Sequence, residues 1–190
     1  MLAYSSVSQL GFVGVGIGLG SALGLVGALL HVLNHAVMKG CLFLVGGAIR
    51  LRTGIVEVPE FAGLGRRMPW TMACFTLAAL SMIGIPPTAG FFSKWTLALA
   101  SLEAQRWVFF AVIVASSLLT AVYLFRVLES VYLRPEQAPE EAAGEGCGEP
   151  PAALFVPIAS LAVLVLALGL GNAVIIRELL SKVALPLEGK

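Results

Sequence analysis

The sequence predicts an all-α, polytopic transmembrane helical bundle, and three observations carry this prediction. Of the 190 residues, 58% are hydrophobic and only 12% are charged, whereas about 25% of residues are charged in soluble domains. The mean hydropathy is +0.94. Apolar runs long enough to cross a bilayer recur along the chain. At about 20 residues per crossing, the length allows about five or six crossings and no sizeable soluble domain.

Net charge and cysteine spacing exclude other classes of protein. The net charge of +1 comes without a basic tract, so the chain offers nothing that would attract nucleic acid. The three cysteines form no C-x-x-C pair and show none of the spacings that hold zinc or iron–sulfur clusters. We therefore expect no cofactor and no catalytic site in this chain.

Membrane helices are predicted for five apolar stretches: residues 4–19, 22–49, 69–102, 107–133 and 154–176. Pro86, Pro87 and Gly90 interrupt the third stretch, because proline lacks an N–H donor and clashes with the preceding turn. We therefore expect one broken helix over about 69–102, which a membrane tolerates only where the freed backbone is buried in protein or lines a wet cavity. A count of Lys and Arg on each side favours two crossings here, whereas the prolines and Lys94 favour one.

The loop over residues 50–68 sets the expected orientation. It contains four arginines: Arg50, Arg52, Arg66 and Arg67. Because cytoplasmic loops carry an excess of Lys and Arg, we expect this loop, and the N-terminus with it, to lie in the cytoplasm. The membrane is expected to be the plasma membrane.

The segment after residue 133 changes character abruptly. Residues 134–152 hold five glutamates, four prolines and three glycines, a composition typical of an exposed linker. We expect an additional membrane helix over 153–176 and a tail over 177–190. Residues 1–133 then form the main unit of the chain.

Three polar residues in the second stretch form one stripe. His31, His35 and Lys39 occur at i, i+4 and i+8, so they share one helix face. A lysine at the centre of a bilayer costs at least about 2.5 to 3.5 kcal/mol. One hypothesis is that the histidines form hydrogen bonds between helices and that Lys39 pairs with an acid on another chain. The alternative is a hydrated proton path, because histidine titrates near physiological pH and water can bridge side chains that do not touch.

Lys94 follows the Pro86-Pro87 interruption within the third stretch. The positive end of the second half-helix favours a neutral amine there, whereas carbonyls of the first half-helix favour the charged form. A small movement could therefore change its charge state. A second interpretation is a lysine at the membrane interface on a re-entrant loop.

Four segments carry a family resemblance: residues 2–9 (LAYSSVSQ), 31–39 (HVLNHAVMK), 63–69 (GLGRRMP) and 84–95 (GIPPTAGFFSKW). In this order and spacing they resemble the antiporter-like subunits of respiratory complex I and of Mrp-type sodium/proton antiporters, most of all the Mrp D-type subunit. The resemblance covers about residues 2–133. It implies a fold of two inverted five-helix repeats, each with a broken helix that carries a functional lysine. This chain resembles the second repeat without the first.

The same resemblance implies roles for the polar residues. Lys94 would be the lysine of the second broken helix and the terminal proton site of its half-channel, and His31, His35 and Lys39 would belong to the central polar axis that feeds it. The glutamate and lysine of the family's first repeat have no counterpart here. We therefore expect the stripe to face a surface that the first repeat would cover, and the chain alone to be poorly stable and inactive.

Three functions remain open at this point. The first is a proton-translocating subunit of a multi-subunit cation/proton antiporter, with protons and sodium as candidate ions. The second is a membrane subunit of an NADH-quinone oxidoreductase or a membrane-bound hydrogenase, with the redox chemistry in partner chains. The third is a structural remnant that inserts but moves nothing. The first two require other membrane subunits, including a chain or segment that carries the first repeat.

Overall fold

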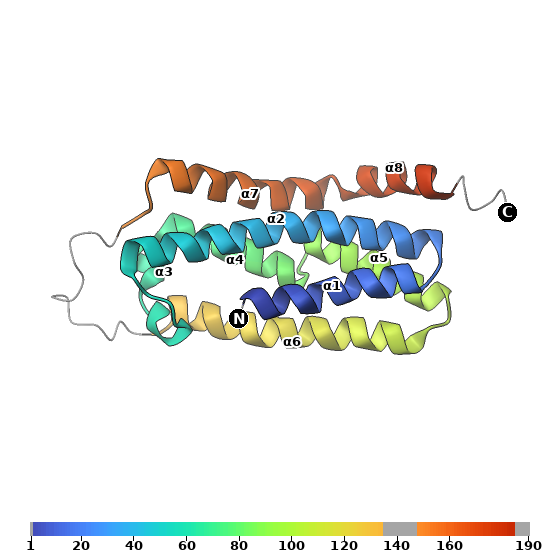
Figure 1. Cartoon of the computed structure of the whole chain (residues 1–190), viewed down its shortest axis with the longest axis horizontal. Helices are drawn as coiled ribbons and strands as arrows, with labels where there is room; N and C mark the ends of the chain where they lie inside the picture. Colours follow the sequence, from blue (N-terminus) through green and yellow to red (C-terminus); the bar gives the residue numbers. More distant parts are fainter. Residues whose placement is uncertain (1, 135–147, 185–190) are drawn as a thin grey trace.

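In the computed structural model, residues 2–134 and 148–184 are described, and the regular structure within them is helical (Figure 1). The helices in chain order are α1 (Leu2–Gly18), α2 (Ala22–Thr53), the 3₁₀ turn η1 (Val58–Phe61), α3 (Leu64–Arg67), α4 (Pro69–Ile83), α5 (Ala89–Glu103), α6 (Trp107–Tyr132), α7 (Ala152–Leu170) and α8 (Asn172–Ala184). Three of them, α2, α6 and α7, are long and apolar enough to cross a membrane, and α1 and α4 are shorter apolar helices. The predicted all-α bundle is confirmed.

The central helix of the bundle is α2. Its 32 residues span about 48 Å at about 1.5 Å per residue, and it contacts α1, α4, α5, α7 and α8. Its N-terminus is capped by Ser21, whose hydroxyl accepts a hydrogen bond from the Gly24 N–H at 3.1 Å. It ends at Thr53, and the next residue, Gly54, adopts a left-handed conformation with φ of 72°. Figure 1 shows α2 between α7 and α1, so α2 has a neighbouring helix on each of these two sides.

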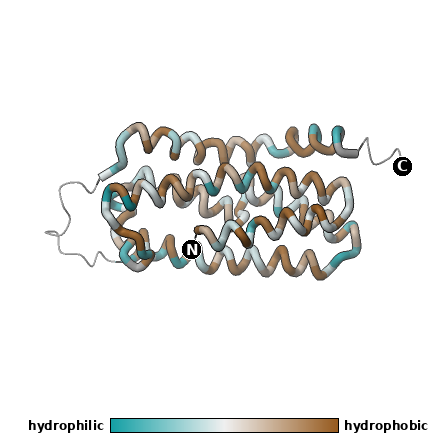
Figure 2. Tube along the Cα trace, in the orientation of Figure 1, coloured by the Kyte–Doolittle hydropathy of each residue, from teal (hydrophilic) through white to brown (hydrophobic). Residues whose placement is uncertain are grey.

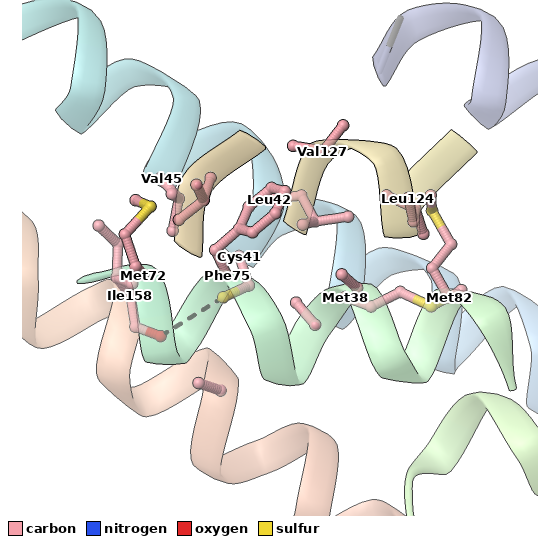
Figure 3. Close-up of a cluster of buried hydrophobic side chains, with 14 of the residues drawn as sticks. Met38, Cys41, Leu42, Val45, Met72, Phe75, Met82, Leu124, Val127 and Ile158 are labelled. Carbon is pink, nitrogen blue, oxygen red and sulfur yellow. Dashed lines mark hydrogen bonds between the residues drawn. The ribbon is translucent and has the colours of Figure 1, made fainter. Parts of the chain in front are cut away.

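The apolar core lies between α2, α4, α6 and α7 (Figure 3). Its labelled side chains are Met38, Cys41, Leu42 and Val45 of α2, Met72, Phe75 and Met82 of α4, Leu124 and Val127 of α6, and Ile158 of α7. The Cys41 thiol donates to the Ile158 carbonyl at 3.7 Å. Ala162 and Val165 of α7 belong to the same core. Helix α7 therefore packs into the same core as α2, α4 and α6.

The stretch 69–102 folds as a broken helix, as predicted. Helix α4 ends after Ile83 because Gly84 takes a left-handed conformation with φ of 94°, and Pro86 and Pro87 supply no N–H donors. Helix α5 resumes at Ala89. The two half-helices follow each other along the long axis of the bundle (Figure 1). The structure therefore has one interrupted helix over this stretch, whereas the count of Lys and Arg on each side of the membrane favours two crossings.

One expected boundary differs in the structure. Helix α7 ends at Leu170, and α8 spans Asn172–Ala184, so the boundary expected at residue 176 falls inside α8. Helix α1 begins at Leu2, whose carbonyl accepts a hydrogen bond from Lys39 in the middle of α2. Because α1 has 17 residues and α2 nearly twice as many, α1 starts level with the middle of α2.

The outer faces of the bundle are apolar. Figure 2 shows hydrophobic residues along most of each helix and hydrophilic residues mainly at the connections. Large apolar side chains such as Val7 of α1, Leu119 of α6 and Val163 of α7 are more than 60% exposed. In water, apolar patches of this kind would promote aggregation, whereas lipid accommodates them. The chain is thus a multi-pass membrane protein.

The described end of the acidic linker is tied to the start of α4. The Glu149 carboxylate accepts hydrogen bonds from the N–H of Trp70 at 2.7 Å and of Thr71 at 3.3 Å, and from the Thr71 hydroxyl. These donors belong to the first turn of α4, which has no intrahelical acceptors for them, and the carboxylate also complements the positive helix end. The Arg52 Nε donates to the Gly148 carbonyl at 3.1 Å. This part of the predicted linker therefore contributes to the fold.

We expect Glu149→Ala to lower the free energy of unfolding by about 1 to 2 kcal/mol, because the donors at the start of α4 lose their acceptor. Thermal unfolding of the purified chain in detergent, followed by tryptophan fluorescence, measures the change. Glu57→Ala is the matched control, since Glu57 is exposed and makes no capping hydrogen bond. Equal melting temperatures for the two variants would contradict a capping role for Glu149.

Candidate functional site

Lys94 connects the two half-helices of the broken helix. It lies near the start of α5 and is only 5% exposed. Its Nζ donates to the carbonyls of Met82 at 2.8 Å and Ile83 at 3.1 Å, in the last turn of α4. These carbonyls have no partner within α4 because the helix ends there, and they form the negative end of its dipole. An ammonium group has three donors, so one remains for a further partner.

The predicted stripe on α2 meets the broken helix beside Lys94. His31 is fully buried, and its Nδ1 lies 3.0 Å from the hydroxyl of Ser93, the residue before Lys94. The His31 and His35 rings stack with centroids 6.4 Å apart and planes at 23°. The stripe therefore runs from the start of α5 along α2 toward Lys39.

Lys39 forms the other end of the stripe and contacts α1. It is 4% exposed, and its Nζ donates to the Leu2 carbonyl at 2.8 Å and to the Ser5 hydroxyl. Among the residues that the structure describes, no carboxylate forms an ion pair with Lys39. The hypothesis that Lys39 pairs with an acid on another chain stays a prediction.

The four predicted ionisable residues form one continuous line. His31 contacts Ser93, the neighbour of Lys94, and its ring stacks on that of His35. Lys39 follows His35 by about one turn on the same face of α2. Phe12 of α1 contacts both Lys94 and His31. Its ring centroid lies 5.1 Å from the Lys94 Nζ and 5.2 Å from the His31 ring centroid. The structure thus brings all four residues together in the order Lys94, His31, His35, Lys39.

The stripe does not face an open surface, contrary to the expectation for a chain without the first repeat. His31 and Lys39 are buried within this chain, and only His35 keeps partial exposure. The reason is α1, which covers the stripe with polar and aromatic side chains spaced along one face: Ser5, Gln9 and Phe12. Sequence reasoning missed this cover. The i, i+4 spacing of a serine and a glutamine in an otherwise apolar helix could have indicated it.

Several buried polar atoms along the stripe have no hydrogen-bond partner among the described residues. They are both amide atoms of Gln9 and the Nε2 atoms of His31 and His35. His31 also lies close to the backbone of Gln9, so these atoms gather between α1 and α2. A buried polar atom without a partner costs about 1 to 3 kcal/mol, and proteins usually satisfy such atoms with water. The α1–α2 interface therefore offers polar groups that can hold water along the stripe.

The interruption is held by contacts to α2 and α4. The Asn34 Nδ2, on α2 between the two histidines, donates to the Ala89 carbonyl at 2.7 Å. The Gly90 N–H donates to the Ser81 hydroxyl at 3.1 Å, and a Cβ at position 90 would overlap the Ser81 carbonyl. Only glycine fits there. Asn34 was not predicted as a site residue, although it lies inside the 31–39 segment.

Comparison with known proteins assigns the chain to a family. The family model described as "NADH:quinone oxidoreductase/Mrp antiporter, TM" matches residues 1–120. The NADH-quinone oxidoreductase subunit N of Desulforudis audaxviator is 50% identical over 194 residues, which cover 98% of this chain and 38% of that protein. The chain therefore belongs to the NADH:quinone oxidoreductase/Mrp antiporter transmembrane family, as the sequence resemblance predicts.

Further relatives agree with this family. The Na(+)/H(+) antiporter D-type subunit of Alkalihalophilus pseudofirmus is 32% identical over 169 residues, which cover 89% of this chain and 34% of that protein. Of these two curated relatives, the oxidoreductase subunit is the more similar in sequence. The chain spans 38% and 34% of the lengths of these two relatives.

Solved structures show the same fold. A chain in the structure of the Mrp complex from Dietzia sp. DQ12-45-1b matches with a TM-score of 0.83 and 29% identity, over 96% of this chain and 41% of that chain. A chain of respiratory complex I from Thermus thermophilus with bound NADH matches with a TM-score of 0.81 and 26% identity, over 95% of this chain and 37% of that chain. The bundle with its broken helix is therefore an antiporter-like fold.

Proposed function

We propose that this chain is the proton-translocating part of a membrane subunit in a multi-subunit cation/proton antiporter. One observation carries the proposal: a line of ionisable groups runs between two buried lysines, and one of these lysines binds the freed carbonyls of a broken helix. Burying two lysines and a histidine in one membrane bundle is costly. Such groups are retained in membrane helices mainly where they serve a proton or ion path.

Protons would move along this line through the side chains and through water between them. The His31 Nδ1 faces Ser93 beside Lys94, while its Nε2 is buried and has no hydrogen-bond partner among the described residues. Because neutral histidine accepts a proton on one ring nitrogen and donates from the other, His31 can pass a proton between the two sides. The rings of His31 and His35 are too far apart for a direct hydrogen bond, so water would bridge them. Lys94 would then load and unload the proton at the interruption.

A second candidate assembly is favoured by the sequence identity. The 50% identity with an NADH-quinone oxidoreductase subunit N supports a membrane-arm subunit of an NADH-quinone oxidoreductase. The proton step in this chain would be the same, but redox chemistry in partner chains would drive it. Both assemblies require other membrane subunits and a chain or segment that supplies the first repeat. The arginines of the 50–68 loop support a cytoplasmic position for that end of the bundle in the plasma membrane.

Reconstitution tests the proposal. The chain is purified alone, and also with the subunits encoded beside its gene, and each preparation is placed in proteoliposomes with an internal pH dye and an imposed pH gradient. We expect no translocation by the chain alone and a sodium-dependent collapse of the gradient by the full assembly. Proton movement that needs NADH and quinone, and not sodium, would instead support the oxidoreductase subunit. An assembly that moves protons equally well without this chain would make it a structural remnant.

A further inference from the structure

Helix α7 follows the first half of the broken helix, from the start of α4 to the interruption. It contacts α4, α5 and α2, and the residues that lead into it bind the start of α4 through Glu149. The family model ends at residue 120, so it says nothing of this helix. Because α7 starts at the first turn of α4 and ends beside the interruption, it can set where the two half-helices lie.

The contact between α7 and the interruption is made by Gly169. This glycine is buried in the last turn of α7. A Cβ at this position would overlap the Pro87 carbonyl oxygen and would come within 2.8 Å of the Thr88 carbonyl carbon and 2.9 Å of the Ala89 nitrogen. All three are backbone atoms, which cannot turn away as the end of a flexible side chain can. The backbone of α7 therefore rests directly on the backbone of the interruption.

The same segment is also held by α2. The Asn34 Nδ2 donates to the Ala89 carbonyl at 2.7 Å, and the Ser93 hydroxyl meets the His31 Nδ1 at 3.0 Å. Thr88 and Ala89 are 2% and 1% exposed, so neighbouring groups surround the segment. Any displacement by α7 must therefore change the distances from α5 to α2, and with them the surroundings of Lys94.

We propose that Gly169 is a positioning residue for Lys94. Because Gly169 has no side chain, the backbone of α7 can contact the backbone of the interruption directly. This contact fixes the start of α5, so that the Lys94 Nζ reaches the carbonyls of Met82 and Ile83. The role rests on the proposed function of Lys94 as a proton carrier. Gly169 itself touches neither Lys94 nor the proton path.

Gly169→Ala tests this role, with Gly40→Ala as the matched control. Gly40 of α2 also lies at a contact with α7. A Cβ at position 40 would meet only the end of the flexible Leu161 side chain, at 3.3 Å. Hydrogen exchange of the Thr88 and Gly90 amides in the purified assembly reports on the interruption without any need for transport. We expect these amides to exchange about 10-fold faster in Gly169→Ala and at the wild-type rate in Gly40→Ala. Unchanged exchange in Gly169→Ala would overturn the proposal.

The second readout is the pH profile of translocation, normalised to the amount of assembled protein. Because a misplacement of about 1 Å can reduce a positioned reaction by about 100-fold, we expect Gly169→Ala to lose at least about 10-fold and to shift the pH of half-maximal rate. A wild-type profile in Gly169→Ala, while removal of the Lys94 amine abolishes translocation, would overturn the positioning role alone. Translocation that survives removal of the Lys94 amine would instead overturn the proposed function.

A double variant covers the case in which Gly169→Ala does not assemble. Asn34→Ala releases the interruption on the α2 side, so the segment can yield to the added methyl group. We expect Asn34→Ala/Gly169→Ala then to assemble with an altered pH profile, and the two effects to be non-additive because they act on one segment. Failure of the double variant to assemble, while Asn34→Ala alone assembles normally, would show that Gly169 only packs α7.

Discussion

Lys94→Met in the assembled complex is expected to reduce proton translocation to the level of membranes that lack the chain, while insertion and assembly remain normal. Methionine is flexible and apolar and suits the buried site, but it can neither donate to the Met82 and Ile83 carbonyls nor carry a proton. The measurement is the quench of an internal pH dye in proteoliposomes, with the amount of assembled protein measured by immunoblot after native electrophoresis.

Two further variants make this result specific. Lys182→Met removes an exposed lysine of α8 and should translocate at the wild-type rate. Lys94→Arg keeps a positive charge and hydrogen-bond donors, but a guanidinium group does not release its proton in proteins. We therefore expect Lys94→Arg to fail as Lys94→Met does. Wild-type rates in Lys94→Arg would mean that Lys94 acts as a fixed charge that holds α4 and α5 together, and not as a proton carrier.

Local chemistry explains why the interruption and the stripe could be predicted from the sequence. Pro86 and Pro87 end a helix through their own covalent structure, so no knowledge of neighbours is needed. The spacing of His31, His35 and Lys39 likewise fixes a common face, because helix geometry alone determines it. These features depend on residues close in the chain, and the structure contains both.

Contacts between distant segments explain what could not be predicted. The cover that α1 places over the stripe depends on which helix packs against which face, and the apolar periodicity of α1 does not encode its partner. The same holds for Glu149 at the start of α4, since the linker composition gives no reason for one of its carboxylates to be a cap 79 residues away. Gly169 resembles any other glycine of an apolar helix in the sequence. Its importance arises only from the backbone that lies opposite.

Gly90→Ala is expected to abolish translocation and also to destabilise the protein, in contrast to Lys94→Met. A Cβ at position 90 would overlap the Ser81 carbonyl, and the Gly90 N–H bond to the Ser81 hydroxyl would be lost with any shift. Overpacking of this kind costs about 1 to 3 kcal/mol. Because α5 starts here, the strain also moves Lys94 away from the carbonyls of Met82 and Ile83. Thermal unfolding in detergent and the dye assay on the same preparation measure the two effects.

Gly47→Ala is the control for this variant. Gly47 also lies inside a helix, but a Cβ there meets no atom within 4 Å, and alanine has the higher helix propensity, by up to about 1 kcal/mol. We therefore expect Gly47→Ala to match or slightly exceed the wild-type melting temperature and to translocate normally. If Gly90→Ala melts and translocates like Gly47→Ala, the close contact between α4 and α5 does not hold Lys94. If it melts normally but does not translocate, the geometry of the interruption serves the proton path without stabilising the fold.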